Sequence, residues 1–401
     1  MIYLNNAATT WPKPPAVTKA LTDAWLAPPE GQGRGVVSAY STMTACRKSL
    51  GRLLGIADTE RIFFASSATD ALNKLLPGIV AGVGADRRAR LKSAPTCVHP
   101  PVTVVSQTEH NSVLRPVYNN PLLSSNVSVV PCDRQGYVTP EAVEHVLQQF
   151  SQSTQSALRI FVLNHCSNVT GAVQDAKAIG EIAHRHGFLF VLDVSQSAGC
   201  VPIDADGWEV DALTFTGHKA LFGPQGTGGF YVRCSVPFHP VVFGGTGRDS
   251  SIIRYDGNYE YEVGTQNVVG IAGLNAGVEY VLRLGTDYIM NTERAMIERI
   301  YDDLSQWPEV TLYGPSPGDG RPRSGVLSFA VAGMSPSDVA YILYSTNGIV
   351  LRSGLHCCPL IHEAMGTDKH GTIRLSVSAL TTADDIQAFL DAMHQLLSAL
   401  R

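Results

Sequence analysis

The sequence predicts an α/β protein with a large, mainly parallel sheet and a smaller C-terminal α+β unit. From about residue 50 to residue 235, short apolar segments alternate with helix-like segments, the pattern of strands joined by helical crossovers. After residue 240 a long helical segment is followed by short strands and helices. The 401 residues also exceed the roughly 250–300 at which a single core stops growing, so we expect two domains.

Seven apolar segments are expected to form the strands of the large sheet. They are RIFFA (61–65), VTVVS (102–106), SVVP (128–131), LRIFVLNH (158–165), FLFVLDV (188–194), DALTFTG (211–217) and GGFYV (228–232). FLFVLDV has no polar residue before Asp193, which is typical of a strand covered on both faces. Between strands, Pro140 marks an expected helix start and Gly187 an expected helix end.

The C-terminal unit is expected to begin with a long helical segment from about residue 267 to residue 307. The segments GVLSFAV, IVLRSG and TIRLSVS predict strands, PSDVAYILYSTNG predicts a helix, and TTADDIQAFLDAMHQLLSAL predicts a capped C-terminal helix. We place the boundary near residue 255, with residues 14–255 in the large domain and residues 1–13 and 256–401 in the small one. The charged segment 84–101 predicts a solvated surface excursion.

The composition argues against several classes of protein. A net charge of −5 and a pI near 6.2, without a basic cluster, give no surface for nucleic acid. The N-terminus lacks the basic and apolar parts of a signal peptide, and no segment approaches the ~20 apolar residues of a membrane span. We therefore expect a soluble cytoplasmic protein. The eight cysteines form no CxxC pair, so we expect neither a disulfide framework nor a zinc finger.

Polar side chains follow the predicted strands at their carboxyl ends, where doubly wound sheets bind ligands. Ser66-Ser67-Ala68-Thr69 separates the first strand from a helix, so free N–H groups there would favour an anion. We expect a phosphate site at this point, although Ser and Thr also commonly cap helices. Other strand ends carry Gln107-Thr108-Glu109-His110, Asn168, and Asp193 with Gln196.

Lys219 follows the strand DALTFTG directly, and its pairing with Asp193 has two interpretations. The two residues, 26 apart in sequence, form either a buried ion pair or part of a cofactor site. Pyridoxal 5′-phosphate needs a lysine for its aldehyde, a carboxylate for its pyridine nitrogen, a planar group such as His110 on its ring and donors for its phosphate. Desolvation would lower the pKa of Lys219 as this role requires. A nucleotide loop at GPQGTG (223–228) is disfavoured because it precedes a strand.

Seven segments resemble, in order and spacing over nearly the whole chain, the cysteine desulfurases of the class V, fold-type I pyridoxal phosphate enzymes. They are YLNNAATT, TEHNSVLRP, SNVTGAV, LDVSQSAG, TGHKALFGPQGTG, YEVGTQN and RSGLHCCP. The RSGLHC element resembles the corresponding element of the sub-branch that has a short cysteine loop and selenocysteine lyase activity. The resemblance implies a fold-type I homodimer that binds pyridoxal phosphate, acts on L-cysteine or L-selenocysteine, and can pass sulfur to an acceptor protein.

The resemblance also implies roles for individual residues. Lys219 would bind the cofactor and move the proton at the substrate α-carbon, while Cys357 would attack the substrate sulfur and leave a persulfide and alanine. The cofactor would be held by Ala68, Thr69, His110, Asn168, Asp193, Gln196, Thr216, His218 and Lys219, with Thr265 reaching in from the partner subunit. The substrate carboxylate would be bound by Asn168, Arg352 and Arg374.

The sequence leaves three points open. His356 is a candidate to help ionise Cys357, and Cys358 stands where the family has a small residue, either to relay the persulfide or to pack. A zinc site from His356, Cys357, Cys358 and His362 is disfavoured because adjacent cysteines chelate one tetrahedral ion poorly, so we expect no metal. The alternative function is a selenocysteine lyase or another carbon–sulfur lyase that uses no covalent cysteine.

Overall fold

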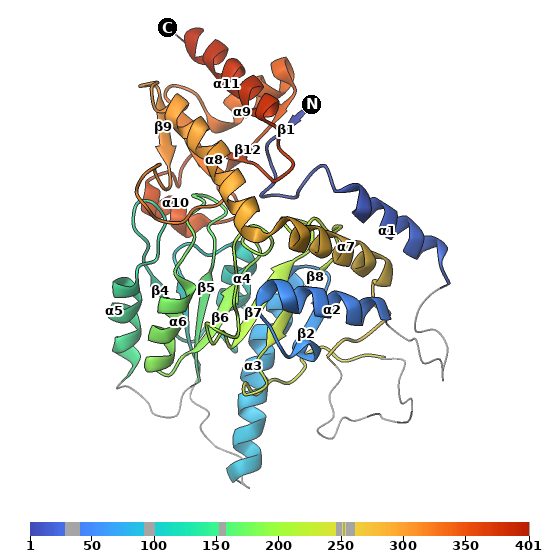
Figure 1. The fold of residues 1–401 in the computed structure, drawn as a ribbon. Coiled ribbons are helices and arrows are strands. Elements are labelled where there is room, and N and C mark those ends of the chain that lie inside the picture. Colours follow the sequence, from blue (N-terminus) through green and yellow to red (C-terminus); the bar gives the residue numbers. More distant parts are fainter. Residues whose placement is uncertain are drawn as a thin grey trace.

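A seven-stranded sheet with helices on both faces forms the larger part of the structure (Figure 1). The computed structural model describes residues 1–28, 41–91, 101–151, 158–245, 251, 253 and 261–400. The strands are β2 (Ile62–Ala65), β3 (Val102–Ser106), β4 (Val127–Val130), β5 (Arg159–Asn164), β6 (Leu189–Asp193), β7 (Ala212–Thr216) and β8 (Gly228–Val232). Their order is β2-β8-β7-β6-β5-β3-β4, and only β8 runs antiparallel to its neighbours. The predicted mainly parallel, seven-stranded sheet is confirmed.

Different helices cover the two faces of this sheet. Successive side chains of a strand point to opposite faces, so Phe161 and Leu163 of β5 join one core while Ile160 and Val162 join the other. The first core includes side chains of α2 (Ser41–Leu54), α5 (Pro140–Ser151), α6 (Ala176–Arg185) and α7 (Val268–Leu284). The second includes side chains of α3 (Ala68–Leu91) and α4 (Asn111–Asn119). Both faces are buried, which explains the continuous apolar strands of the sequence.

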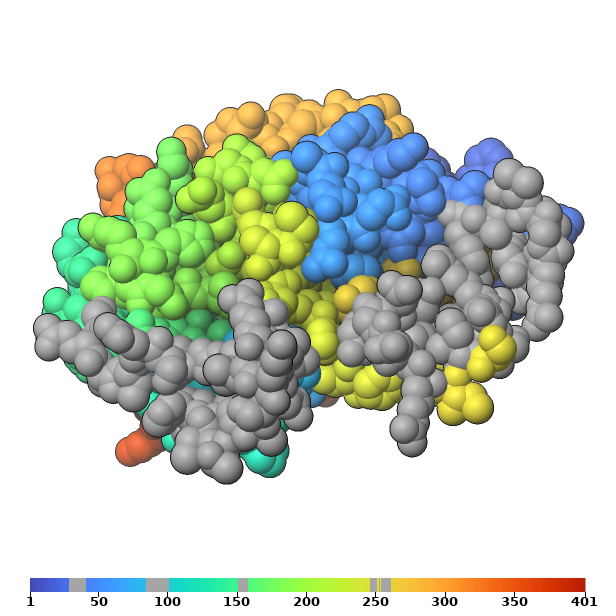
Figure 2. Space-filling model, turned by 90° about the horizontal axis from the view of Figure 1, so that it is seen from below, coloured from blue at the N-terminus to red at the C-terminus, as the bar shows by residue number. Residues whose placement is uncertain are grey.

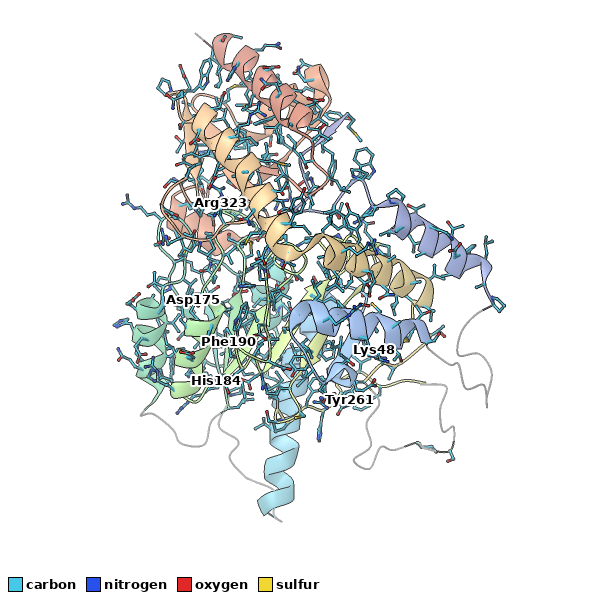
Figure 3. All side chains as sticks on the ribbon, viewed as in Figure 1. Lys48, Asp175, His184, Phe190, Tyr261 and Arg323 are labelled. Carbon is cyan, nitrogen blue, oxygen red and sulfur yellow. The ribbon has the colours of Figure 1, made fainter. Side chains whose placement is uncertain are left out.

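Helix α6 shows which edge of the sheet carries the strand ends. It runs from its N-cap Asp175 at the upper edge to His184 at the lower edge, and Phe190 lies in the sheet between them (Figure 3). Since the crossover helices run opposite to the parallel strands they connect, the carboxyl ends of these strands lie at the upper edge. This edge faces the C-terminal part of the chain (Figure 1).

The C-terminal part contains a four-stranded antiparallel sheet. Its order is β12-β13-β10-β9, formed by β9 (Val310–Tyr313), β10 (Val326–Val331), β12 (Arg352–Gly354) and β13 (Thr372–Ser376). Figure 2 shows the end of the molecule that lies away from this C-terminal part. The described residues at that surface lie mainly before residue 245. The helices of this part are α8 (Thr286–Leu304), α9 (Pro336–Asn347), α10 (Pro359–Met365) and α11 (Ala383–Ser398). The predicted cap of α11 is confirmed, since Thr382 and Asp385 form a capping box.

The N-terminus lies with this C-terminal part. Strand β1 (Ile2–Tyr3) pairs in parallel with β11 (Ile349–Val350), and Leu4 belongs to the core formed by the C-terminal strands and helices. From there the chain passes through α1 (Pro15–Leu26), which packs on α7, to the large sheet; a 3₁₀ turn, η1 (Thr59–Arg61), precedes β2. The predicted domain boundary near residue 255 lies outside the described residues.

Two predictions about helices need correction or completion. The expected long helix from 267 to 307 is two helices, α7 and α8, because the chain bends by 80° at Gly285. Gly285 has φ +83° and ψ 134°, backbone angles that glycine adopts far more readily than other residues, and it ends one helix and begins the next. In the charged segment 84–101, residues up to Leu91 continue α3, and residues 92–100 lie outside the described part.

No single described helix is long and apolar enough to cross a bilayer. Only the bent pair α7–α8, taken together, has the length and composition of a membrane span.

The bend at Gly285 gives a prediction about stability. Gly285→Ala is expected to lower the free energy of unfolding by about 1–2 kcal/mol, because a Cβ is strained at this φ although no neighbour lies within 4 Å of it. Gly285→Asn should lose a similar amount, because ψ 134° lies outside the αL region that asparagine tolerates. Denaturant unfolding of the parent and the two variants measures these losses, and equal stabilities of Gly285→Ala and the parent would contradict the prediction.

Candidate active site

A pocket of about 190 Å³ lies at the carboxyl ends of the parallel strands and is closed by residues of the C-terminal sheet. It brings together all the predicted site residues except Cys357 and Thr265. The shared lining residues are Ala68, Thr69, His110, Asn168, Asp193, Gln196, Thr216, His218, Lys219, Arg352 and Arg374. Predicted site residues separated by up to 306 positions, from Ala68 to Arg374, therefore meet in one cavity.

One side of the pocket presents hydrogen-bond donors at the start of α3. Ser67 Oγ accepts the N–H of Asp70 at 3.1 Å, so this serine caps the helix, as one interpretation of the sequence proposed. Ala68 and Thr69 are the first residues of the helix, where N–H groups have no intrahelical acceptor. The Thr216 hydroxyl and His218 Nδ1 lie nearby, buried and without a partner in the described structure. These groups fit the phosphate of pyridoxal phosphate.

His110 is held as a neutral, oriented ring beside this site. It is the N-cap of α4, and its Nδ1 accepts the N–H of Ser112 at 3.0 Å. A ring nitrogen that accepts from a backbone N–H is unprotonated, so the ring proton lies on Nε2. Burial, followed by the charges of Lys219 and Arg352, lowers the pKa of His110 to about 3. The imidazole is therefore uncharged at neutral pH and can cover a planar ring.

Asp193 ends β6 and is 3% exposed. Its Oδ1 accepts from the Ser195 N–H at 2.9 Å, the Ser195 hydroxyl at 2.5 Å and the Thr214 hydroxyl at 3.3 Å. All three bonds go to one oxygen, which leaves Oδ2 available to a cationic ligand atom. This arrangement fits a protonated pyridine nitrogen.

Lys219 follows β7 and carries an amine of reduced basicity. Burial, opposed by the nearby charge of Asp193 and assisted by Arg374, lowers the pKa of Lys219 to about 8. Lys219 and Asp193 line the same pocket, and within the described residues no direct ion pair joins them. This arrangement favours the cofactor interpretation of the sequence over a simple ion pair.

Two arginines form the opposite side of the pocket. Arg352 of β12 and Arg374 of β13 stand directly opposite each other in the antiparallel register. Burial, with a further contribution from Arg352, lowers the pKa of Arg374 to about 9, and its Nε is buried without a partner. Its other nitrogens donate to Asn168 O and Asn5 Oδ1, both at 3.1 Å. Two adjacent guanidinium groups with an unused donor fit the carboxylate of an amino acid.

Cys357 lies at the edge of the pocket, where a second cavity of about 600 Å³ opens along α4. Its half-buried Sγ is 3.4 Å from Arg352 Nη2, which donates to it. His356 does not face this sulfur: its buried ring is 3.0 Å from the Thr372 hydroxyl, and burial lowers its pKa to about 2. This geometry argues against the hypothesis that His356 helps to ionise Cys357, and the nearest cationic group is Arg352.

Thr265 is separated from the pocket in its own chain. It is exposed and lines a different cavity with Ser66 and Lys74. Within one subunit, Thr265 therefore lies beside Ser66 and Lys74 but outside the pocket that Ala68, Thr69 and Thr216 line.

Sequence reasoning gave no role to several residues at the site. Ser112 and Ser195 line the pocket, and the N–H of each donates to the side chain two positions earlier, of His110 and Asp193 respectively. Glu109 lies beneath the pocket, fully buried, with Oε1 accepting from the Ser106 hydroxyl and the Asn164 N–H. Burial raises its pKa to about 8. The signal for the two serines was their position two residues after His110 and Asp193. Short polar side chains such as that of Asp193 commonly accept the N–H of the residue two positions later.

The described residues contain no group of three or more His, Cys, Asp or Glu side chains arranged to hold a metal ion. In particular, Cys358 is directed to Asn168 and His362 to Thr367.

Comparisons with known proteins agree with this geometry. A protein of Methanothermobacter thermautotrophicus named "probable cysteine desulfurase" is 30% identical over 98% of this chain and 94% of its own length. A protein of the same name from Halalkalibacterium halodurans is also 30% identical, over 98% of this chain and 93% of its own length. The apo structure of a cysteine desulfurase from Thermococcus onnurineus NA1 superposes with a TM-score of 0.83 at 28% identity, covering 99% of this chain and 95% of that one.

The family model for class-V aminotransferases matches residues 2–389. Proteins of this family depend on pyridoxal phosphate, and the solved relatives share the fold-type I architecture described above. The match extends over both sheets and includes all the residues of the pocket. The chain belongs to the class-V aminotransferase family.

Proposed function

We propose that the protein is a pyridoxal phosphate-dependent cysteine desulfurase, which converts L-cysteine to L-alanine and keeps the sulfur as a persulfide on Cys357. The observation that carries this proposal is the position of one half-buried thiol beside Arg352, at the edge of a pocket that also holds Lys219 and Asp193. The names of the relatives support the same activity.

The residues of the pocket divide into a cofactor set and a substrate set. Thr69, Thr216 and His218 would hold the phosphate, His110 would cover the ring and Asp193 would keep the pyridine nitrogen protonated. Gln196 would meet the phenolic oxygen, and its Nε2 donates to Ala7 O at 3.0 Å, which fixes its position. When bound, pyridoxal phosphate supplies an electron sink for the carbanion chemistry. Arg374, Arg352 and Asn168 would bind the substrate carboxylate.

The chain's own groups then carry the proton and the sulfur. The Lys219 amine, with its lowered pKa, is partly unprotonated near neutral pH and can take the substrate α-proton. The Cys357 thiolate forms a bond to the substrate sulfur as the carbon–sulfur bond breaks, and the electron pair of that bond stays with carbon. Protonation of this carbon gives alanine, and the persulfide remains on Cys357 for an acceptor.

Both parts of the chain contribute side chains to the site, which supports the division into two domains. We propose residues 14–255 as the cofactor-binding domain and residues 1–13 with 256–401 as the small domain. Strand β1 pairs with β11, and the small sheet supplies Arg352 and Arg374, both of which support this division.

Mass spectrometry after addition of L-cysteine tests the proposed function. One added sulfur on the peptide that contains Cys357, together with alanine as product, is the expected result. Alanine without added sulfur would favour a lyase that uses no covalent cysteine, and pyruvate would contradict a desulfurase. Assays with L-selenocysteine under the same conditions rank the two substrates.

We further propose a homodimer with shared active sites. Thr265 is exposed and does not line the pocket of its own chain, which leaves its hydroxyl available to the cofactor phosphate of a partner subunit, as the resemblance implies. Thr265→Ala is expected to weaken cofactor affinity about tenfold, the effect of losing one hydrogen bond to a charged group. Equilibrium dialysis measures the affinity and light scattering the assembly state. A monomer that binds the cofactor as tightly as the parent protein would contradict this prediction.

A further inference from the structure

The side chain of Asn168 forms two hydrogen bonds with residues 355–358, which we call the cysteine loop. Its Nδ2 donates to the carbonyl oxygen of His356 at 2.9 Å, and its Oδ1 accepts from the Cys358 thiol. The His356 carbonyl can only accept a hydrogen bond, so the amide nitrogen of Asn168 must face it. The amide oxygen then needs a donor, and in the described structure that donor is Cys358. Both side chains are buried, at 3% and 0% exposure.

Two residues of the cysteine loop have backbone angles that are unfavourable for non-glycine residues, and hydrogen bonds to the loop carbonyl groups stabilise them. His356 has φ +49° and Cys357 has φ +61°, and both are non-glycine residues in the left-handed region. Two consecutive carbonyl groups of this turn accept hydrogen bonds: His356 O from Asn168 Nδ2, and Cys357 O from the Asn111 N–H at 2.8 Å. Loss of either bond would allow the turn to relax and would move Cys357 away from Arg352.

The surroundings of Cys358 do not suit a sulfur relay. Its side chain packs with Val169 and Ile361 in a small apolar cluster, whereas Cys357 is half-buried at the edge of the pocket. Burial raises the pKa of the Cys358 thiol well above its usual range, so the thiol stays protonated and keeps its hydrogen for Asn168.

We propose that Cys358 is a positioning residue: its thiol fixes the amide of Asn168, which holds the His356 carbonyl and so keeps Cys357 at the pocket. The proposal deepens the proposed function and rests on it, because Cys357 is taken as the sulfur acceptor. It also gives the second cysteine of the loop a role that requires a hydrogen-bond donor and does not require a thiolate.

Hydrogen exchange of the cofactor-free protein tests the hydrogen bond without any turnover. In Cys358→Ala, amides of the cysteine loop are expected to lose protection about tenfold, because Asn168 Oδ1 becomes a buried acceptor without a donor. Cys358→Val, which refills the space without a donor, should show the same loss. Cys358→Ser should keep protection. Cys46→Ala, which removes another buried thiol far from the pocket, is the matched control and should leave these amides unchanged.

The rate of persulfide formation on Cys357 gives the functional measurement. Cys358→Ala and Cys358→Val are expected to be about tenfold slower at saturating cysteine, with the absorption spectrum of the bound cofactor unchanged, and Cys358→Ser within about threefold of the parent. The proposal is overturned if Cys358→Ala matches the parent in both measurements, if Cys358→Ser is as slow as Cys358→Ala, or if added sulfur maps to Cys358. A parent protein that forms no persulfide would count against the desulfurase alone, since hydrogen exchange still decides the role of Cys358.

Discussion

Lys219→Ala is expected to lower the rate of alanine formation by more than about 10³-fold, the largest effect of any single change in this protein. The variant would lose both the amine that we propose for the cofactor aldehyde and the proposed base for the substrate α-proton, and general base catalysis alone contributes about 10²–10⁴-fold. Lys219 is the lysine that lines the pocket, and burial lowers the pKa of its amine to about 8. A steady-state assay of alanine measures the loss.

Reduction with borohydride provides the structural control for this prediction. In the parent protein, borohydride should fix the cofactor to the peptide that contains Lys219, and in Lys219→Ala no peptide should carry it. Lys48→Ala, at an exposed position of α2, serves as the matched lysine variant and should keep both the adduct and the activity (Figure 3). A covalent adduct elsewhere in Lys219→Ala, with the yellow colour retained, would show that another lysine binds the cofactor.

The seven strands and the pocket could be predicted because both follow from short-range patterns. A strand buried on both faces is a continuous apolar run, and parallel strands place their last residues at one edge, so Asp193 and Lys219 were expected to be neighbours. Arg352 and Arg374 were assigned by resemblance alone. Their opposition in β12 and β13 depends on the register of an antiparallel pair, and no local pattern in the sequence fixes that register.

The remaining features depend on contacts that no local pattern reports. Gly285 is a local signal for a helix end, but an isolated glycine also occurs inside helices, and the apolar pattern resumes after it, so the bend became clear only from the structure. His356 was expected to act on the cysteine beside it in sequence. Left-handed backbone at positions 356 and 357 instead turns its ring toward Thr372. Adjacent residues in a tight turn point in different directions, so proximity in sequence was misleading here.

Cys357→Ser is expected to reduce desulfuration of L-cysteine to below about 1% of the parent rate while the absorption spectrum of the bound cofactor stays unchanged. Serine cannot accept sulfur as a persulfide, and Cys357 contacts Arg352 without lining the pocket that we propose for the cofactor. Activity toward L-selenocysteine, where present, should survive in part, because selenide leaves more readily than sulfide and depends less on attack by a thiolate.

Cys358, the next residue in sequence, provides a direct comparison for Cys357→Ser. Cys358 is buried against Asn168 and differs from Cys357 in direction as well as in exposure, so the two serine variants should behave differently. Cys358→Ser keeps the hydrogen-bond donor and should still form the first persulfide, whereas Cys357→Ser should not. Rates of alanine formation and mapping of added sulfur in both variants decide the assignment. An inactive Cys358→Ser beside an active Cys357→Ser would mean that the reactive sulfur is one residue later, and that the cysteine loop opens to expose it during turnover.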